Sequence, residues 1–388
     1  MLVSPYRPGG VPRYLAGRES ELRALRDFIA PTLAYGQKAD AQMVLHGPRG
    51  VGKTSLMKTA AAAAEEDGMI VAWTSCHRGQ PFLADIARSI DSALTKVDAA
   101  RPPDWPMRVE RVTAELKVPA LAGLRAELGR TRRAAPPAGV VSALEDLLRD
   151  GATRAAGQRT HRAGAGLLIA IDEVHAADIA ELAILLNASQ NLNDATGVPL
   201  AIVASGLSSA RGLFTRAATF GERTRWLRVT SLDRDELREA VVHPGRTLGV
   251  EWDDEAVDQV LDSAQGYPHF AQVMANATWN EARPDVGDRV TASHAGAGLL
   301  RGHQEVLDLY HARWDSLSPK EQEIVSTIAE TGTASGARRS AVEQVIGYDI
   351  SSYRARLLDR DVLEDAERGV LQFSLPGFAE FVLEQSAR

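Results

Sequence analysis

The stretch HGPRGVGKTS (residues 46–55) follows a short apolar run and leads into an alanine-rich segment. Gly47, Gly52, Lys53 and Thr54 satisfy the pattern G-x-x-x-x-G-K-[ST], with a further glycine at position 50. Glycine allows successive backbone N–H groups to wrap around an anion without interference from a Cβ atom. The N-terminus of the following helix adds the positive end of its dipole. A flexible glycine turn is the simpler alternative, but the strand before and the helix former after it favour a phosphate-binding loop.

The residue types of this loop (the P-loop) predict ATP and Mg²⁺ as its ligands. Lys53 is expected to reach the β- and γ-phosphates, and the Thr54 hydroxyl to coordinate Mg²⁺. The residues expected to surround the nucleotide phosphates are Gly47, Pro48, Arg49, Gly50, Val51, Gly52, Lys53, Thr54 and Ser55.

An acidic pair follows a second apolar run, in LLIAIDEVH (residues 167–175). The run places Asp172 at the carboxyl end of a central strand, where ligands of α/β sheets bind. We expect Asp172 to contact Mg²⁺ and Glu173 to be the base for an attacking water. Ser205 ends the next apolar run and is expected to position the γ-phosphate or the water. A helix-capping Asp-Glu pair and an ordinary strand-end serine are the structural alternatives.

The hydrophobic pattern predicts an α/β core with a parallel sheet over residues 14–232. Near-continuous apolar runs at 42–47, 69–75, 166–173, 199–206 and 226–232 are typical of strands buried on both faces. Helix-like segments alternate with them, as in a doubly wound domain. Residues 101–139 interrupt the pattern with VTAELKV and LAGLRAEL, which alternate apolar and polar residues and predict an inserted β-hairpin. Basic residues outnumber acidic ones there, which fits either a solvated edge or a binding surface.

Two further domains are predicted after the core. Helical patterns fill residues 233–300, which we interpret as a helical lid, beginning at a capped SLDRDEL segment. Residues 301–388 hold further helical patterns, a short β-type segment and a closing helix, the order of a winged-helix module.

Composition limits the class of protein. The chain has 388 residues, a net charge of −7 and one cysteine, Cys76, which excludes an intramolecular disulfide and a multi-cysteine metal site. No stretch approaches the roughly 18–20 apolar residues of a membrane helix, and the N-terminus has no signal-peptide core. We therefore expect a cytoplasmic protein without a membrane partner.

The order of these motifs resembles that of AAA+ ATPases, in particular the branch of origin-recognition-type initiators, archaeal-type ATPases and STAND signal-transduction ATPases. YLAGRESELRALRDFI (residues 14–29) is similar to their G-R-E entry motif. The resemblance covers nearly the whole chain and implies that Leu15, Ala16 and Arg18 line the adenine side of the site.

The lid departs from the initiator pattern. No arginine or lysine occurs between Thr247 and Ala282, where initiators carry a sensor arginine. GYPHF (residues 266–270) is similar instead to the G-x-P motif of STAND and archaeal-type ATPases, and implies that Pro268 and His269 approach the nucleotide. Histidine senses phosphate less strongly than a fixed guanidinium, which favours a nucleotide-gated switch with slow turnover. An ordinary lid histidine is the alternative.

Other arginines are candidates for contacts with partners. Arg223 is a candidate to complete the site of a neighbouring subunit, which would require a homo-oligomer. In the winged helix, the expected DNA contacts are Arg354, Arg356 and Arg360. Residues 301–388 hold 15 acids against 10 basic residues, however, and such a net charge weakens DNA binding.

Three functional hypotheses follow from the sequence. The first is an ATPase that hydrolyses ATP with Mg²⁺ and acts as a nucleotide-gated switch. The second is a DNA-binding initiator or mobile-element ATPase that assembles on duplex DNA. The third is a regulatory protein that binds ATP without hydrolysing it and contacts a protein partner.

Overall fold

The computed structural model describes residues 1–97, 105–115, 120–130, 135–157, 166–193, 197–333, 336–364 and 369–386. The chain divides into two compact units. The first unit contains residues Met1–Glu19, Gly47–Ser55 and Val229–Arg388, and the second contains Ser20–His46 and Leu56–Arg228. The P-loop is therefore grouped with the C-terminal part of the chain, although the strand before it belongs to the second unit.

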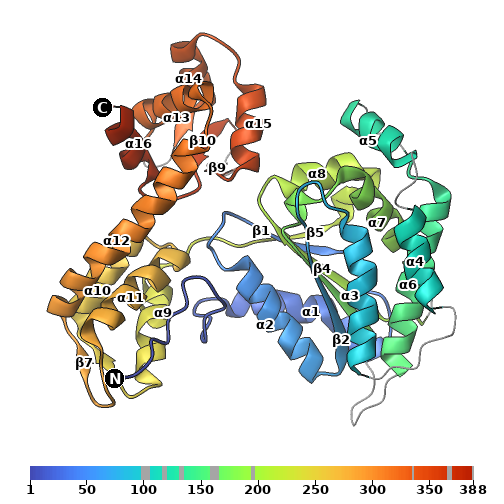
Figure 1. The fold of residues 1–388 in the computed structure, drawn as a ribbon, viewed down its shortest axis with the longest axis horizontal. Helices are drawn as coiled ribbons and strands as arrows, with labels where there is room; N and C mark the ends of the chain where they lie inside the picture. Colours follow the sequence, from blue (N-terminus) through green and yellow to red (C-terminus); the bar gives the residue numbers. More distant parts are fainter. Residues whose placement is uncertain are drawn as a thin grey trace. The chain divides into compact units, whose positions relative to one another are not determined.

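The second unit is built on a parallel sheet, which confirms the predicted fold class (Figure 1). Within the described residues, five strands lie in the order β2-β3-β4-β1-β5. Their bounds are β1 Met43–His46, β2 Met69–Ser75, β3 Gly166–Asp172, β4 Leu200–Gly206 and β5 Arg225–Arg228. Every residue of β3 and β4 is buried, as expected of central strands that read as continuous apolar runs.

The register brings the carboxyl ends of three strands to one edge of the sheet. Leu45 of β1 is level with Ser205 of β4, and His46 is level with Gly206. Ile171 of β3 is level with Ala204, so that Asp172 follows at the same edge. The P-loop starts at this edge as well, because it follows β1 directly in the chain.

Helices cover the sheet of the second unit. They are α1 Glu19–Tyr35, α2 Lys53–Glu66, α3 Phe82–Lys96, α4 Trp105–Glu115, α5 Ala120–Arg130, α6 Ala138–Gly157, α7 Ile179–Asn191 and α8 Ala210–Ala217, with the 3₁₀ turns η1 Val174–Ala176 and η2 Thr219–Arg223. In Figure 1, α3, α4 and α6 lie side by side. The core of this unit joins α3, α6 and α7 to the central strands.

The β-hairpin predicted for residues 101–139 is wrong, because the described residues there form α4 and α5. The apolar side chains that become buried have helical spacing: Trp105 and Val112 are seven residues apart, and Leu124 and Leu128 are four apart. Alanine, leucine, arginine and glutamate, which dominate these segments, are strong helix formers. In such short segments, apolar residues spaced for one face of a helix can also read as a strand-like alternation, so the pattern alone does not separate the two structures.

The first unit carries the helical segment predicted after residue 232. It contains α9 Arg234–Arg246, α10 Asp254–Ala264, α11 Pro268–Ala282 and the long helix α12 Ala292–Asp315, with short parallel strands β6 Glu251–Trp252 and β7 Arg289–Val290. A capping box of Asp233 and Glu236 starts α9, as the sequence pattern predicts. Tyr6 from the N-terminal segment packs edge-on against Trp252 and Trp279 and is buried.

The chain ends in a C-terminal module, which we define as residues 319–386. Its elements are α13 Pro319–Thr331, β8 Ala337–Arg338, α14 Arg339–Ile346, α15 Ser351–Asp359, β9 Leu363–Glu364, β10 Val370–Phe373 and α16 Phe378–Ser386. The three strands form an antiparallel sheet in the order β8-β10-β9. Tyr310 of α12 packs against Phe378 and Phe381 of the module.

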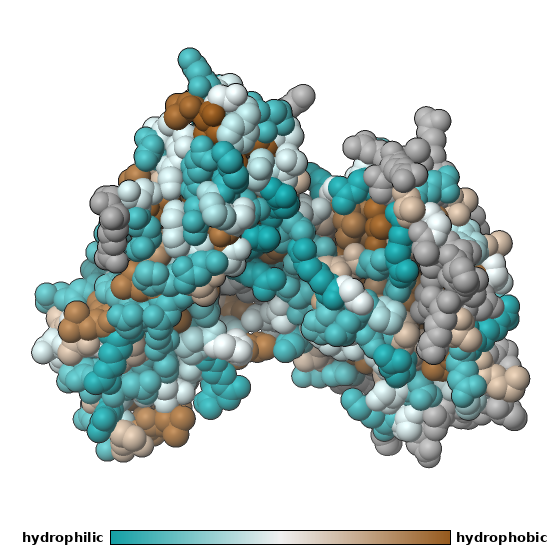
Figure 2. Space-filling view, turned by 45° about the horizontal axis from the view of Figure 1, so that its top comes forward, coloured by the Kyte–Doolittle hydropathy of each residue, from teal (hydrophilic) through white to brown (hydrophobic). Residues whose placement is uncertain are grey.

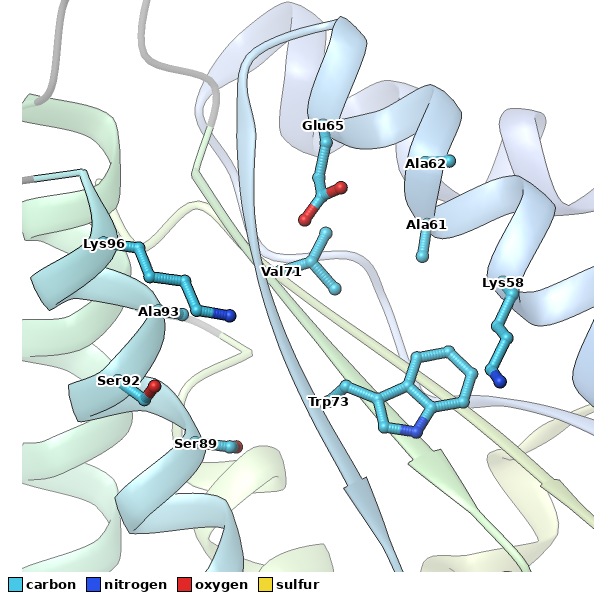
Figure 3. A pocket seen from close by; sticks show the side chains of 10 residues that line it. All are labelled: Lys58, Ala61, Ala62, Glu65, Val71, Trp73, Ser89, Ser92, Ala93 and Lys96. Carbon is cyan, nitrogen blue, oxygen red and sulfur yellow. The ribbon is translucent and has the colours of Figure 1, made fainter.

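The edge strand β2 is flanked by charged side chains. Among the described residues β2 pairs with β3 alone. A hollow of about 310 Å³ lies between α2, β2 and α3. Figure 3 shows Glu65 and Lys96 directed toward Val71 from the two helices, and Lys58 lies 5.7 Å from the Trp73 ring centre. Charged side chains at an edge strand oppose pairing with other chains, so we interpret this hollow as a protected sheet edge.

The face of the molecule in Figure 2 is mainly hydrophilic, with hydrophobic residues in small groups. No helix in the described part of the chain is both long and apolar enough to cross a membrane.

Glu181 provides a test of the second unit's packing. Its side chain is only 1% exposed, and Oε2 accepts a hydrogen bond of 2.9 Å from the Leu83 amide at the start of α3. Burial raises the pKa of this carboxyl. A raised pKa means that the folded state binds the proton more tightly, so stability falls as the pH rises through the unfolded pKa toward the folded one.

In Glu181→Gln, the amide oxygen can still accept the Leu83 hydrogen bond, but the side chain no longer titrates. We expect the unfolding free energy of the wild type to fall relative to Glu181→Gln as the pH rises from about 4 to 7. Urea denaturation at several pH values measures this difference. Parallel pH profiles for the two proteins would contradict the assignment.

Candidate nucleotide site

The P-loop needs glycine at three positions. Gly47, Gly50 and Gly52 have φ angles of 155°, 78° and 97°, a region that residues with a Cβ rarely adopt. A Cβ on Gly47 would lie 2.1 Å from the Val229 carbonyl oxygen, and one on Gly50 would lie 2.8 Å from the Tyr267 ring. Backbone conformation and close neighbours therefore both favour glycine at positions 47 and 50, and backbone conformation alone favours it at position 52.

Lys53 begins helix α2 and bends back over the loop. Its ammonium donates a hydrogen bond of 2.9 Å to the Gly47 carbonyl and another to that of Pro48. Thr54 and Ser55 follow in the first turn and are half-buried. The first N–H groups of a helix have no partner within it, so they attract anions. The loop thus combines a buried cation, glycine amides and a helix N-terminus.

The entry motif lies against the loop within the first unit. Arg18 is 4% exposed, and Nη2 donates to the Val51 carbonyl at 2.9 Å and to the Thr230 carbonyl at 2.5 Å. Ala16 is buried and Leu15 is half-buried. Arg18 therefore connects the P-loop backbone to the segment that leads into the lid.

The lid contacts the loop through Tyr267, a residue that the sequence did not single out. Its hydroxyl donates to the Arg49 carbonyl, and burial raises its pKa. Pro268 starts helix α11. The His269 ring bonds to the backbone of Pro8, and burial lowers its pKa. Within the GYPHF motif, the hydrogen bond to the P-loop therefore comes from Tyr267.

The C-terminal module reaches the loop as well. Asp361, just after α15, accepts a hydrogen bond from the Arg49 amide with an N···Oδ2 distance of 3.3 Å. Sequence reasoning missed this contact, because Arg49 and Asp361 are 312 residues apart and no local pattern connects them.

The acidic pair occupies the carboxyl edge of the sheet in the second unit. Asp172 ends β3 and is buried. Its Oδ1 accepts hydrogen bonds from the Ser205 hydroxyl and, at 3.0 Å, from the Glu173 amide. The parallel pairing of β3 and β4 at this edge thus brings Asp172 and Ser205 together.

Glu173 has a strained backbone. Its φ of 55° places a non-glycine residue in the left-handed region, at the start of η1. Its Oε2 lies 3.7 Å from Nε2 of the buried His175. Strained conformations of this kind concentrate at functional sites. Asp172 is fixed by its place at the end of β3, whereas the carboxylate of Glu173, in the turn that follows, lies near His175.

The remaining predicted contacts lie elsewhere on the surface. Arg223 ends η2 and is exposed. Arg354 is half-buried in α15. Arg356 and Arg360 are exposed but lie 3.1 Å and 3.3 Å from the carboxylate of the buried Glu321.

These residues fit a nucleoside triphosphate and a magnesium ion. The glycine cradle has no room for a Cβ at Gly47 or Gly50 and presents amides to an anion. Each within its own unit, Thr54 offers a hydroxyl oxygen and Asp172 offers a carboxylate oxygen, and both are donor types that Mg²⁺ accepts alongside phosphates and water.

Comparison with protein families finds two matches along the chain. Residues 14–203 match the family described as an AAA ATPase domain. Residues 307–382 match a domain of unknown function, DUF8462. No curated protein matches the sequence significantly.

Among solved structures, the fold is similar to that of a Walker-type ATPase of Pyrococcus abyssi, with a TM-score of 0.60 at 15% identity over 98% of both chains. It is also similar to the ORC2 protein of Aeropyrum pernix, solved in ADPNP–ADP complexes. That match has a TM-score of 0.54 at 16% identity and covers 98% of this chain and 97% of the other. At these identities the likeness concerns the fold.

The glycine requirement in the loop is testable with a matched pair of substitutions. Gly50 and Gly79 both have positive φ angles, 78° and 74°, but a Cβ on Gly79 would meet nothing within 4 Å. We expect Gly79→Ala to cost about 1–2 kcal/mol of stability from backbone strain alone. Gly50→Ala should cost more, because the Tyr267 ring must also move. Equal unfolding free energies for the two variants would contradict this packing.

Proposed function

This chain belongs to the AAA+ P-loop ATPases through residues 14–203, and from that premise we propose that it binds ATP with Mg²⁺, hydrolyses it slowly and changes conformation with the bound nucleotide. The observation that carries the proposal is the P-loop. Three positive-φ glycines lead from β1 into a helix that begins with Lys53. Such a backbone offers several amides to one polyphosphate.

The residues have separate roles in the proposed reaction. Lys53 and the loop amides would hold the phosphates, while Thr54 and Asp172 would hold the metal ion. When bound, Mg²⁺ neutralises charge on the phosphate oxygens. Glu173 accepts the proton of the attacking water, and its strained backbone supports a role other than packing. The Ser205 hydroxyl holds the Asp172 carboxylate in place.

The proposed switch uses the contacts around the loop. Tyr267 of the lid and Arg18 of the entry motif both bond to loop carbonyls. A ligand that draws the loop backbone around its phosphates alters these bonds. Because Arg18 also bonds to Thr230, a change in the loop is passed to the segment that enters the lid.

We further propose that the C-terminal module is a winged helix, on the order of its elements: helix, strand, two helices, two strands. DNA binding through α15 is a weaker proposal than nucleotide binding. Arg356 and Arg360 are paired with Glu321, so contact with DNA phosphates would have to compete with a buried carboxylate. Arg223 is exposed and remains a proposal for a contact supplied to a second copy.

Lys53 tests nucleotide binding. In Lys53→Ala the loop loses its buried cation, and we expect the affinity for Mg-ATP to fall by about tenfold to a hundredfold, the range of one charge-assisted bond. Lys58→Ala is the matched control, because Lys58 is an exposed lysine on the same helix outside the loop. Isothermal titration calorimetry measures the Mg-ATP affinity of both variants and of the wild type. Unchanged affinity in Lys53→Ala, or an equal loss in Lys58→Ala, would contradict the proposed site.

Glu173 tests hydrolysis separately from binding. Glu173→Gln keeps the size of the side chain but removes the base, and we expect turnover to fall by about 10²–10⁴-fold with little change in Mg-ATP affinity. Phosphate release and calorimetry provide the two measurements. If the wild type binds Mg-ATP but shows no turnover, the regulatory hypothesis replaces the ATPase. Full turnover in the variant would remove Glu173 from the mechanism.

A further inference from the structure

The C-terminal module places a buried carboxylate on the P-loop. Asp361 is 3% exposed, and its Oδ2 accepts a hydrogen bond from the Arg49 amide with an N···O distance of 3.3 Å. Arg49 lies between the first two glycines of the loop. A backbone amide that binds a carboxylate in this way belongs to an anion-binding surface.

Arg313 of α12 holds the Asp361 carboxylate in this position. The Arg313 guanidinium of α12 lies 2.9 Å from the same Oδ2 and is itself largely buried. Arg313 also donates to the Asp361 carbonyl and, at 2.8 Å, to the Ser374 hydroxyl. The φ of 57° at Asp361 is a left-handed conformation that aspartate and asparagine tolerate better than most residues. The carboxylate is therefore fixed in position.

This ion pair is not explained by stability alone. Taking two charges out of water costs several kcal/mol per ion, and well-packed apolar residues often replace a buried pair without loss. The pair therefore calls for a role outside packing, and its bond to the phosphate-binding loop supplies one.

The junction between module and loop is not tightly packed. A cavity of about 620 Å³ adjoins it and is lined by Pro48 of the loop, Tyr267 of the lid and Ser374 of the module, among other residues. The hydrogen bond between the Arg49 amide and Asp361 therefore joins module and loop beside an open cavity.

We propose that Asp361 is a specificity-determining residue of the nucleotide site, which opposes a triphosphate more strongly than a diphosphate. The inference depends on the proposed function, because it requires that the loop bind nucleotide phosphates. A carboxylate and a phosphate on neighbouring amides of one loop repel each other, and the repulsion grows with the charge of the ligand. A triphosphate carries one more negative charge than a diphosphate, so its binding favours release of the module from the loop.

The first test compares Asp361→Asn with the wild type in calorimetric titrations with Mg-ATP and Mg-ADP. Asparagine keeps the shape and tolerates the left-handed backbone, but removes the charge. We expect the ratio of the ATP to the ADP dissociation constant to fall about tenfold in the variant, equivalent to about 1.4 kcal/mol.

Two further variants keep the test interpretable. Glu364→Gln is the control, because it removes a nearby charge of the module that also lines the cavity; its ratio should match the wild type. Arg313→Gln/Asp361→Asn removes both members of the buried pair, so a fall in its ratio reports the lost carboxylate and not an uncompensated Arg313 cation; we expect a fall smaller than in Asp361→Asn.

The outcomes separate the inference from the proposed function. An unchanged ratio in both Asp361 variants, or an equal fall in Glu364→Gln, overturns the inference while nucleotide binding stands. If neither the wild type nor the Asp361 variants bind any nucleotide, the proposed function fails and the inference fails with it.

Discussion

Binding a polyphosphate through backbone N–H groups requires a chain that turns several amides to one side, and glycine adopts the positive-φ conformations of this turn far more readily than residues with a Cβ. In this protein the requirement is met by Gly47, Gly50 and Gly52 between β1 and α2. The neighbours of the loop depend on the same turn. Arg18 and Tyr267 bond to its carbonyls, and Asp361 accepts one of its amides. Entry motif, lid and C-terminal module thus all contact one short piece of backbone.

The boundary between the two compact units passes through this part of the chain. The P-loop is grouped with the lid and the C-terminal module, while β1 and most of α2 are grouped with the sheet that carries Asp172 and Glu173. The phosphate-binding residues and the acidic pair therefore belong to different units.

The parts of the fold that follow from local pattern were predictable from the sequence. Continuous apolar runs located the five strands, and the G-x-x-x-x-G-K-[ST] pattern located the loop. The helices α4 and α5 were mistaken for a hairpin, because a short alternating segment fits either structure and tertiary packing decides between them. Tyr267 and Asp361 contact Arg49 across 218 and 312 residues of sequence, and no local signal marks such contacts.

Hydrogen–deuterium exchange of the segment 47–55, with and without Mg-ATP, tests the central claim most directly, because it observes the loop amides themselves. The account predicts that Mg-ATP slows exchange in this segment, and that Mg²⁺ alone does not. Exchange in the loop that is unchanged by saturating Mg-ATP, with protection appearing elsewhere in the chain, would contradict the claim that these amides hold the nucleotide.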